Sequence, residues 1–421
     1  MKQTTTTEIA RALKTAQANG LISDQDTSVI FVEQSIISDR VMRLKKSFPD
    51  STLHAVAIKS NPLAVALKLL VEMGVGLEAA SVTEVIMASD AGARNNQIVF
   101  DSPAKTKSEI EFLRENYPGI RINADSLEEL SRYAKSESKF SLGLRINPEV
   151  ESKTTKSMNV GGAYSKFGQR LTSANRDAVV ESCLHWEDLD CLHFHIGSQH
   201  QKLEPVFEAA NIVVELAESI NDRAGYKKVT TIDIGGGFPV NYHNGPSFLI
   251  EDYASALAEN CPALMDGTYQ LITEFGRYVH ASAAWAATQV EYVKDITDNE
   301  QIAIVHVGAD MFLRECYNPD DWHHKHFVLD RHFGQKTEGH NACVDFAGPL
   351  CFGGDFVLRK SNLPRVNIGD WLVVLDSGAN TFALWSRHCS RPFPKVILSN
   401  QKSFEVIKPR ETYDAIKRFW K

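Results

Sequence analysis

The feature that most constrains the fold is a series of eight short apolar segments, each followed by a stretch of helical character. The segments cover residues 53–59, 75–79, 97–100, 119–122, 140–146, 191–197, 230–234 and 270–274. Helical stretches such as 82–91 and 107–116 lie between them. This alternation, without a dinucleotide-binding glycine fingerprint near its start, predicts an α/β fold, a (β/α)8 barrel of the TIM type.

The pattern changes near residue 286. Short apolar segments separated by turn residues then recur to residue 407, which predicts a mainly antiparallel β domain. We therefore expect an N-terminal segment at 1–29 that packs on the β domain, a barrel at 30–285 and the β domain at 286–421.

Composition narrows the class of protein. The net charge of −8 and the absence of a basic stripe argue against nucleic acid as a partner. The seven cysteines form no CxxC pair, which favours a reducing compartment. Neither a signal peptide nor a run of about 18 apolar residues is present, so we expect a cytoplasmic protein without a membrane span.

The first apolar segment of the barrel ends on a lysine. Lys59 closes the run that begins at His54, and Asn61-Pro62 then turns the chain away. One interpretation is an exposed structural lysine. The other is a Schiff-base lysine, whose amine is made nucleophilic by an apolar setting that lowers its pKa.

Two glycine-containing motifs follow later apolar segments. In His193-Phe-His195-Ile-Gly197-Ser198 the two histidines point to one face of a strand, but no third metal ligand stands at a telling spacing. A bare backbone and the Ser198 hydroxyl suit a phosphate better. Three consecutive glycines, Gly235, Gly236 and Gly237, let backbone N–H groups converge on an anion, although a tight turn has the same appearance.

Two further motifs supply an acid and a thiol. Glu274 ends the last predicted barrel strand, and Gly276-Arg277 follows it. This motif offers one inward carboxylate and one cation for a phosphate. A barrel rim with ordinary salt bridges would have the same sequence pattern. Cys351 lies in a glycine-rich loop with Asp355 four residues on. It is either a reactive thiol or a buried structural cysteine.

In this order along the chain, the motifs resemble the fold-type III pyridoxal-phosphate decarboxylases, which include the ornithine, arginine and diaminopimelate decarboxylases. The resemblance extends from about Ile30 to Ile397. The text is most similar to the diaminopimelate branch in three places, at Arg145-Ile-Asn-Pro-Glu-Val150, Ser165-Lys-Phe-Gly168 and His195-Ile-Gly-Ser-Gln199.

The resemblance implies pyridoxal 5'-phosphate as cofactor and a role for each matching residue. Lys59 would hold the cofactor covalently, His195 would stack on its ring, and Glu274 would pair with the pyridine nitrogen. Cys351 would protonate the carbon that loses carbon dioxide, in the active site of a neighbouring copy, which implies a homodimer. The remaining cofactor-binding positions are Glu78, Arg145, Ser198, Gly235, Gly236, Gly237, Gly276 and Arg277.

The chain departs from the family pattern around the substrate. Phe352 follows Cys351 where relatives often carry an acid that grips a distal ammonium, and Asn380 stands at a usual tyrosine near the phosphate. Arg314 lies in a loop that resembles the carboxylate-binding loop of diaminopimelate enzymes, or it forms a surface salt bridge with Asp310 or Glu315. With Asp355 and Arg387 counted as further substrate-binding candidates, we expect an amino-acid substrate with an acidic or unusual tail.

Three other functions remain open. A racemase on the same fold usually has an arginine at the pyridine nitrogen and a catalytic tyrosine, so Glu274 and Cys351 favour the decarboxylase. A non-catalytic pyridoxal-phosphate carrier is typically a lone barrel. A degenerate paralogue that binds the cofactor without catalysis would fit the departures at Phe352 and Asn380.

Overall fold

The computed structural model describes residues 3–133, 139–152, 154, 158–242, 247–336, 340–400 and 403–421. It contains two compact units. The barrel unit consists of Arg40–Asn241 and Gly245–Val279, and the β unit consists of Met1–Asp39, Tyr242–Asn244 and His280–Lys421. This division differs from the expected boundaries, because residues 30–39 and 280–285 belong to the β unit.

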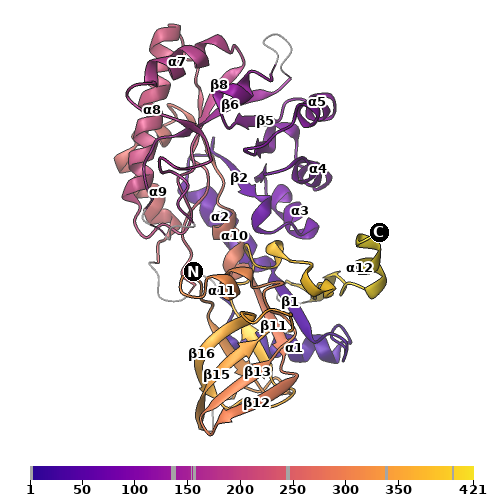
Figure 1. Cartoon of the computed structure of the whole chain (residues 1–421). Helices are drawn as coiled ribbons and strands as arrows, with labels where there is room; N and C mark the ends of the chain where they lie inside the picture. Colours follow the sequence, from indigo (N-terminus) through magenta and orange to yellow (C-terminus); the bar gives the residue numbers. More distant parts are fainter. Residues whose placement is uncertain are drawn as a thin grey trace. The chain divides into compact units, whose positions relative to one another are not determined.

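Eight parallel strands close the barrel, as the alternation of strands and helices predicted (Figure 1). Closure is complete because the fourth strand pairs with the fifth and the last pairs with the first. The order around the ring is β2 (Leu53–Ala57), β3 (Gly76–Ala79), β4 (Ile98–Asp101), β5 (Arg121–Ala124), β6 (Ser141–Asn147), β8 (Leu189–His193), β9 (Thr231–Asp233) and β10 (Gln270–Thr273). A two-residue strand, β7 (Gln169–Arg170), pairs with the end of β6.

Helices follow the barrel strands, and local sequence signals start several of them. Thr106 and Glu109 form a capping box at one start, and Ser81 caps another. Because the strands are parallel, all of their carboxyl ends meet at one rim, where TIM barrels carry their active sites. The helices are α2 (Gln34–Ser47), α3 (Ala64–Glu72), α4 (Val82–Asp90), α5 (Lys107–Asn116), α6 (Leu127–Leu130), α7 (Arg176–His185), α8 (Glu204–Ala224), α9 (Ile250–Asn260) and α10 (Gly276–His280), with 3₁₀ turns η1 (Ile58–Ser60), η2 (Asn95–Gln97) and η4 (Pro262–Leu264).

The β unit contains two sheets, and most of its strand pairs are antiparallel. The six-stranded sheet has the order β14 (His326–Leu329), β17 (Trp371–Val374), β11 (Ala284–Gln289), β1 (Ser28–Glu33), β18 (Lys395–Ser399) and β19 (Phe404–Lys408). The four-stranded sheet has the order β12 (Tyr292–Thr297), β13 (Glu300–Ile304), β15 (Asn341–Ala347) and β16 (Phe356–Pro364). Short helices complete the unit: η5 (Ala281–Ala283), α11 (Leu313–Tyr317), η6 (Phe382–Leu384), η7 (His388–Ser390) and α12 (Tyr413–Phe419).

The N-terminal residues build the core of the β unit, which explains why the barrel starts later than expected. Helix α1 (Thr6–Ala18) buries one face, because its apolar residues recur at the spacing of helical turns. Strand β1 lies between β11 and β18, and Phe31 stacks on Trp285 with 4.2 Å between ring centroids. The core that these elements share includes Ile9, Leu13, Val29, Phe31, Trp285, Trp371 and Ile397.

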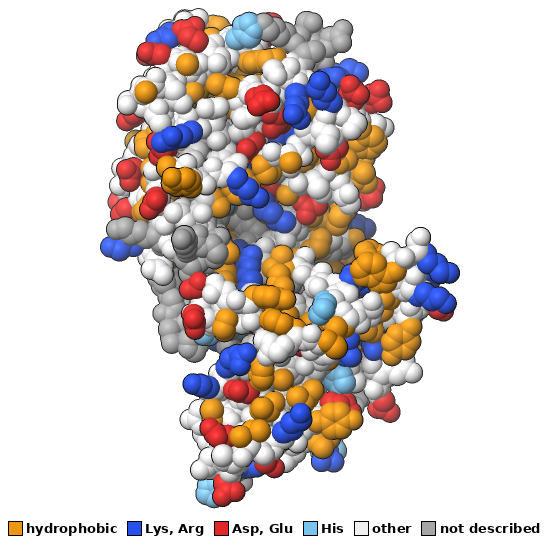
Figure 2. Space-filling view, viewed as in Figure 1, with side chains coloured by type: hydrophobic (Ala, Val, Ile, Leu, Met, Phe, Trp, Pro, Cys, Tyr) orange, Lys and Arg blue, Asp and Glu red, His pale blue; other side chains and the backbone are white. Residues whose placement is uncertain are grey.

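The surface fits the composition. Figure 2 shows acidic and basic side chains interspersed over the visible face. Within the described ranges, no helix is both long enough and apolar enough to cross a lipid bilayer.

Candidate active site

A lysine–glutamate pair lies at the carboxyl-end rim of the barrel. Lys59 is in η1, directly after β2, and Glu78 is on β3 opposite Ala57. The register brings Lys59 Nζ to 2.6 Å from Glu78 Oε2. The Glu78 side chain is fully buried, whereas 50% of the Lys59 side chain is exposed. The lysine side chain is therefore partly open at the rim, while its amine is paired with a buried acid.

The charge around Lys59 differs from the apolar setting that the sequence suggested. Loss of surrounding water would lower the pKa of the Lys59 amine, but the carboxylates of Glu78, Glu274 and Asp101 outweigh it and raise that pKa. Burial raises the pKa of Glu78 to about 7, against the opposing effect of Lys59. The expectation of a lowered lysine pKa was wrong for this state, because the apolar strand delivers the amine to a ring of acids.

A group of buried charged residues connects four barrel strands near this pair. Arg145 on β6 donates to Asp101 on β4 over 3.2 Å. His193, at the end of β8, lies between two carboxylates, with Nδ1 3.7 Å from Asp101 and Nε2 3.8 Å from Glu274. Glu274 Oε1 is buried without a hydrogen-bond partner among the described residues. Burial, with Asp233 and Glu78 nearby, raises the pKa of Glu274 well above its ordinary value.

The buried charged residues change the assessment of a metal site that the sequence allowed. The sequence argument rested on the missing third ligand for His193 and His195. The fold places Asp101, His193 and Glu274 so that one ligand atom of each lies within 4.8 Å of the others. His195 is not in that group, so the same-face pair is not the arrangement that the structure brings together.

Glycine is required where two of the predicted anion-binding positions approach other backbone. Gly235 has φ 64°, and a Cβ there would lie 2.8 Å from Phe194 O. Gly237 has φ 98°, and a Cβ there would lie 2.2 Å from Gly197 O. Residues that carry a β-carbon rarely adopt such φ values. The loop after β9 therefore folds tightly against the loop after β8.

Cationic and hydroxyl groups from two strand ends meet beside this glycine loop. Arg277 Nε donates to Ser198 Oγ over 3.3 Å, although 79 residues separate them. Gly236 N donates to His195 Nδ1 over 3.3 Å. Burial, with the positive charges of Arg145 and Lys59, lowers the pKa of His195 well below its ordinary value, so the ring is neutral. The remaining candidate, Gly276, starts α10 next to Ser60, where a Cβ would lie 2.6 Å from the hydroxyl oxygen.

The predicted thiol lies in the β unit. Cys351 is exposed, in the loop between β15 and β16. Its neighbour Phe352 stacks on Tyr317 with 4.7 Å between ring centroids and an interplanar angle of 12°. The surface next to the thiol is therefore aromatic.

Two of the predicted substrate-binding residues already form contacts within the β unit. Asp355 is 3% exposed, and its carboxylate accepts the backbone N–H of Ala309 over 2.6 Å and of Leu350 over 2.7 Å. These bonds hold the loop, and the substrate-binding role of Asp355 stays a prediction. Arg387 is paired with Glu411, and its guanidinium lies over the ring of Phe419. Its charge is therefore already neutralised.

The remaining two candidates lie elsewhere in the same unit. The guanidinium of Arg314 is 4.7 Å from the ring centroid of Trp322. Of the two acids suggested as its partners, Glu315 pairs with His324 over 2.8 Å and Asp310 accepts the N–H of Gly308 over 2.8 Å. Asn380 follows β17, half-buried, with φ 54°.

Sequence reasoning missed two residues of the barrel site. Asp101 ends β4, and Asp233 ends β9 and accepts the N–H of Gly235 over 2.9 Å. An acid at the last position of a predicted barrel strand was the available signal. In the β unit it missed Cys389, whose Sγ accepts the N–H of Cys351 over 3.4 Å. Cys389 lies 38 residues after Cys351 in the chain, so no local sequence pattern links the two.

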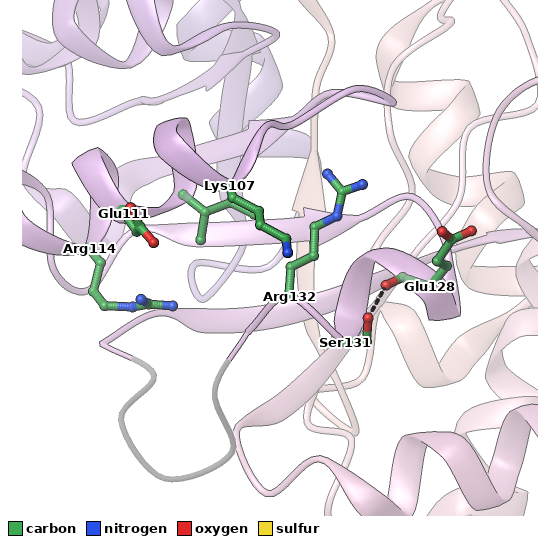
Figure 3. Close-up of a pocket in the computed structure, with 7 residues that line it drawn as sticks. Lys107, Glu111, Arg114, Glu128, Ser131 and Arg132 are labelled. Carbon is green, nitrogen blue, oxygen red and sulfur yellow. Dashed lines mark hydrogen bonds between the residues drawn. The ribbon is translucent and has the colours of Figure 1, made fainter.

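A separate hollow lies beside α5 and α6, with a volume of about 470 Å³ (Figure 3). Its charged side chains are of both signs, and none is a predicted site residue. They are Lys107, Glu111, Arg114, Glu128 and Arg132. The hollow is thus not the site at the rim.

Comparison with known proteins gives a consistent result. Residues 34–281 match the family described as "Pyridoxal-dependent decarboxylase, pyridoxal binding domain". The chain is 30% identical over 401 residues to the diaminopimelate decarboxylase of Aquifex aeolicus, covering 93% of this chain and 90% of the relative. It is 28% identical to that of Archaeoglobus fulgidus, covering 93% and 92%. The crystal structure of diaminopimelate decarboxylase from Helicobacter pylori complexed with L-lysine aligns with a TM-score of 0.82, 26% identity and coverage of 96% and 99%.

Proposed function

Because the chain belongs to the pyridoxal-dependent decarboxylases, we propose that it decarboxylates an amino acid whose distal end carries a carboxylate and no free ammonium. The family establishes the class of enzyme, a carboxy-lyase that uses pyridoxal 5'-phosphate. Neither a racemase nor a non-catalytic paralogue is favoured by these relatives. The distal group of the substrate and the roles of the residues are the proposal.

The residues at the barrel rim fit this cofactor. An amine with an open side chain, Lys59, lies within a layer of buried carboxylates. Glu274 offers a buried oxygen that has no hydrogen-bond partner among the described residues, as suits a carboxylate that faces a protonated ring nitrogen. The loop at Gly235 suits a phosphate because it has no β-carbon to obstruct an anion, and the Arg277–Ser198 pair suits one because it combines a guanidinium with a hydroxyl.

When bound, pyridoxal phosphate supplies an electron sink for the electron pair that is left when a carboxylate departs as carbon dioxide. The protein residues would hold and tune it. We assign covalent attachment to Lys59, the ring nitrogen to Glu274, the ring face to His195 and the phosphate to Ser198, Gly235, Gly236, Gly237, Gly276 and Arg277. Glu78 and Arg145 belong to the buried charged residues near Lys59, and Asn380 is assigned to the phosphate by its position in the family pattern.

Cys351 is the proposed proton donor to the carbon that loses its carboxylate. Its thiol is exposed, as a group must be if it serves a neighbouring copy of the chain. We therefore propose a homodimer in which each β unit completes the partner's site. His195 is assigned to the ring face, and its Nδ1 accepts the N–H of Gly236.

The observation that carries the substrate proposal is the Phe352–Tyr317 stack beside Cys351. An aromatic pair offers no counter-charge to a distal ammonium, and the acid of the same loop, Asp355, is buried and occupied. A charge-assisted hydrogen bond contributes about 1.5–3 kcal/mol, so an ammonium binds there roughly ten- to a hundredfold less tightly than it would beside a carboxylate. Arg314 is the proposed partner of a distal carboxylate.

Carbon dioxide release from three related amino acids tests the proposal. Lysine has a distal ammonium, 2-aminopimelate has a distal carboxylate, and meso-diaminopimelate has both. We expect kcat/KM to be highest for 2-aminopimelate, lower for meso-diaminopimelate by about tenfold or more, and lowest for lysine. A preference for meso-diaminopimelate or lysine would overturn the proposed tail.

A pair of variants assigns the preference to the aromatic surface. Phe352→Glu should move the preference toward meso-diaminopimelate and lysine, because it supplies the missing carboxylate. Phe352→Tyr keeps the ring and should retain the wild-type order. The same shift in both variants would show that the identity of this residue does not set the preference.

A further inference from the structure

Two exposed thiols meet on the surface of the β unit. Cys351 lies between β15 and β16, and Cys389 lies within η7 (His388–Ser390). The backbone N–H of Cys351 donates to Cys389 Sγ over 3.4 Å. We propose that Cys351 and Cys389 form a reversible intrachain disulfide when the protein meets a hydroperoxide, and that Cys389 is the resolving thiol for Cys351.

The other cysteines do not share this setting. Four of the seven are buried, and burial raises the pKa of Cys183 to about 12 and that of Cys261 to about 11. Such thiols are enclosed by protein, so a hydroperoxide does not reach them. The fifth, Cys343, is half-buried on β15. Exposure and proximity to a second thiol thus coincide at Cys351 and Cys389.

Buried hydrogen bonds anchor both loops that carry the thiols. The carboxylate of Asp355 holds the Cys351 loop through Leu350 N, at 2.7 Å. Ser386 N donates to Asp310 O over 2.8 Å, which ties the start of the Cys389 segment to the neighbouring loop. Glu411 holds the other end of that segment, because it pairs with Arg387 and accepts Phe393 N over 3.2 Å. The two sulfurs are therefore kept near each other by contacts that do not involve them.

The backbone at Cys389 is also set for this approach. Cys389 has φ 57° and Ser390 has φ 51°, in the left-handed region that residues with side chains seldom adopt. Such conformations persist where surrounding contacts impose them. Here the contacts of Arg387 and Phe393 hold a turn in which Cys389 Sγ accepts the N–H of Cys351.

The chemistry balances with a hydroperoxide as oxidant. The thiolate of one cysteine attacks the terminal peroxide oxygen and the O–O bond breaks. The other oxygen takes a proton and leaves as water from hydrogen peroxide, or as an alcohol from an organic hydroperoxide, so that sulfur becomes a sulfenic acid. The second thiolate attacks that sulfur, the S–S bond forms, and the sulfenic oxygen leaves as water after protonation. The two sulfurs lose two electrons in total, and the peroxide gains them.

The consequence for catalysis rests on the proposed function of Cys351. In the reduced protein, the hydrogen bond to Cys389 and its charge raise the pKa of Cys351, which favours the protonated thiol that a proton donor requires. In the disulfide no such proton exists. Oxidation should therefore stop turnover, and reduction of the disulfide should restore it.

Peptide mapping of the holoenzyme after brief treatment with hydrogen peroxide tests the pair. We expect a cross-linked peptide that contains Cys351 and Cys389, lighter by two hydrogen atoms than the sum of its parts and absent after treatment with dithiothreitol. The matched control is Cys343→Ser, which should give the same cross-link. A peroxide-treated wild-type protein in which Cys351 is oxidised without a bond to Cys389 would overturn the proposal.

Activity provides a second measurement. The wild-type protein should lose activity in peroxide and regain it in dithiothreitol. In Cys389→Ser the loss should become irreversible, because Cys351 without a resolving thiol proceeds to sulfinic and sulfonic acids. Full recovery of Cys389→Ser would refute the resolving role. The mass measurement needs no turnover, so failure of the disulfide and failure of the proposed decarboxylation give different results.

Discussion

The barrel rim and the thiol-bearing surface of the β unit present their polar groups in opposite ways. At the rim, Glu78, Asp101 and His193 are buried at strand ends, and neighbouring strands bring them within reach of one another. On the β unit, Cys351 and Cys389 are exposed on loops. Regular strand pairing therefore positions the charged residues, whereas individual carboxylates such as Asp355 position the thiols.

The difference indicates how each region can vary. A rim residue is held by strands on both sides, so changing it disturbs a connected network of charges. A residue on an anchored loop can change without disturbing its anchor, as Phe352 illustrates, since Asp355 bonds backbone groups and not the phenyl ring. The substrate tail is thus the property that the β unit can alter most easily.

The largest expected effect is a loss of activity in variants of either region, and its recovery when the two variants are mixed. Lys59→Ala should abolish the adduct that borohydride fixes on the cofactor, and Cys351→Ala should lower amine formation by roughly 10²-fold or more while the cofactor stays bound. If each site takes its lysine and its thiol from different copies, mixing the two variants should restore about one quarter of wild-type activity, because half of the dimers are mixed and each has one intact site.

The control for this complementation is a chain that carries both substitutions. It should remain inactive alone and in equal mixture with either single variant, because no dimer in these mixtures has an intact site. Exchange of subunits must be verified by co-purification of differently tagged chains. Mixed dimers that form without any recovery of activity would show that lysine and thiol come from the same copy.

A smaller effect is expected at the anchor of the thiol loop. In Asp355→Asn the amide has one acceptor oxygen in place of two, so a buried backbone N–H of Ala309 or Leu350 loses its partner. We expect the free energy of unfolding of the β unit to fall by about 1–3 kcal/mol. Tryptophan fluorescence in urea measures this, since five of the six tryptophans lie in the β unit: Trp285, Trp322, Trp371, Trp385 and Trp420.

Asp345→Asn is the matched control. Within the described part of the chain, its carboxylate accepts one backbone N–H, that of Lys360 over 2.6 Å, at an exposed position. A change of about 0.5 kcal/mol or less is expected there. If Asp355→Asn instead left stability unchanged and raised KM, the residue would contact substrate after all.

The two units also differ in pH dependence. Burial lowers the pKa of His54 and of His200 in the barrel unit to about 4, so each is neutral when folded. Because the folded pKa is below the unfolded value near 6.5, stability falls as pH drops from 6.5 toward 4, by at most about 1.4 kcal/mol per pH unit for each histidine. His280 in the β unit behaves alike, with burial lowering its pKa to about 3.

His324 in the β unit has the opposite sign. Burial alone would lower its pKa, but Glu315 at 2.8 Å outweighs burial and raises it. The His324 contribution to the free energy of unfolding is therefore complete below pH 6.5, and it is lost as pH rises through the raised pKa of the folded state. Hydrogen exchange, corrected for its intrinsic pH dependence, should show peptides around His324 losing protection at alkaline pH, and His324→Gln should remove that limb. Equal alkaline loss in wild type and variant would contradict the assignment.

Much of the barrel was predictable because its signals are local. All eight predicted strand segments overlap the strands of the closed sheet, since a buried parallel strand is a short apolar run between turn signals. The β unit was less predictable. Strands β11 and β16 were not expected, and β1 pairs with strands that are more than 250 residues away, such as at Ser28 and Thr288. Nothing in a strand's own residues encodes a partner so distant.

The sequence by itself determined the class of this protein and most of its rim residues, because lysine, glycine and glutamate at strand ends are readable in order along the chain. Only the tertiary structure decided what surrounds them. It made the setting of Lys59 acidic, enclosed His193 between two carboxylates, and occupied Asp355 with backbone N–H groups. It also brought Cys389 to Cys351. Burial and charge at a residue depend on which distant segments fold against it, and spacing along the chain does not record that.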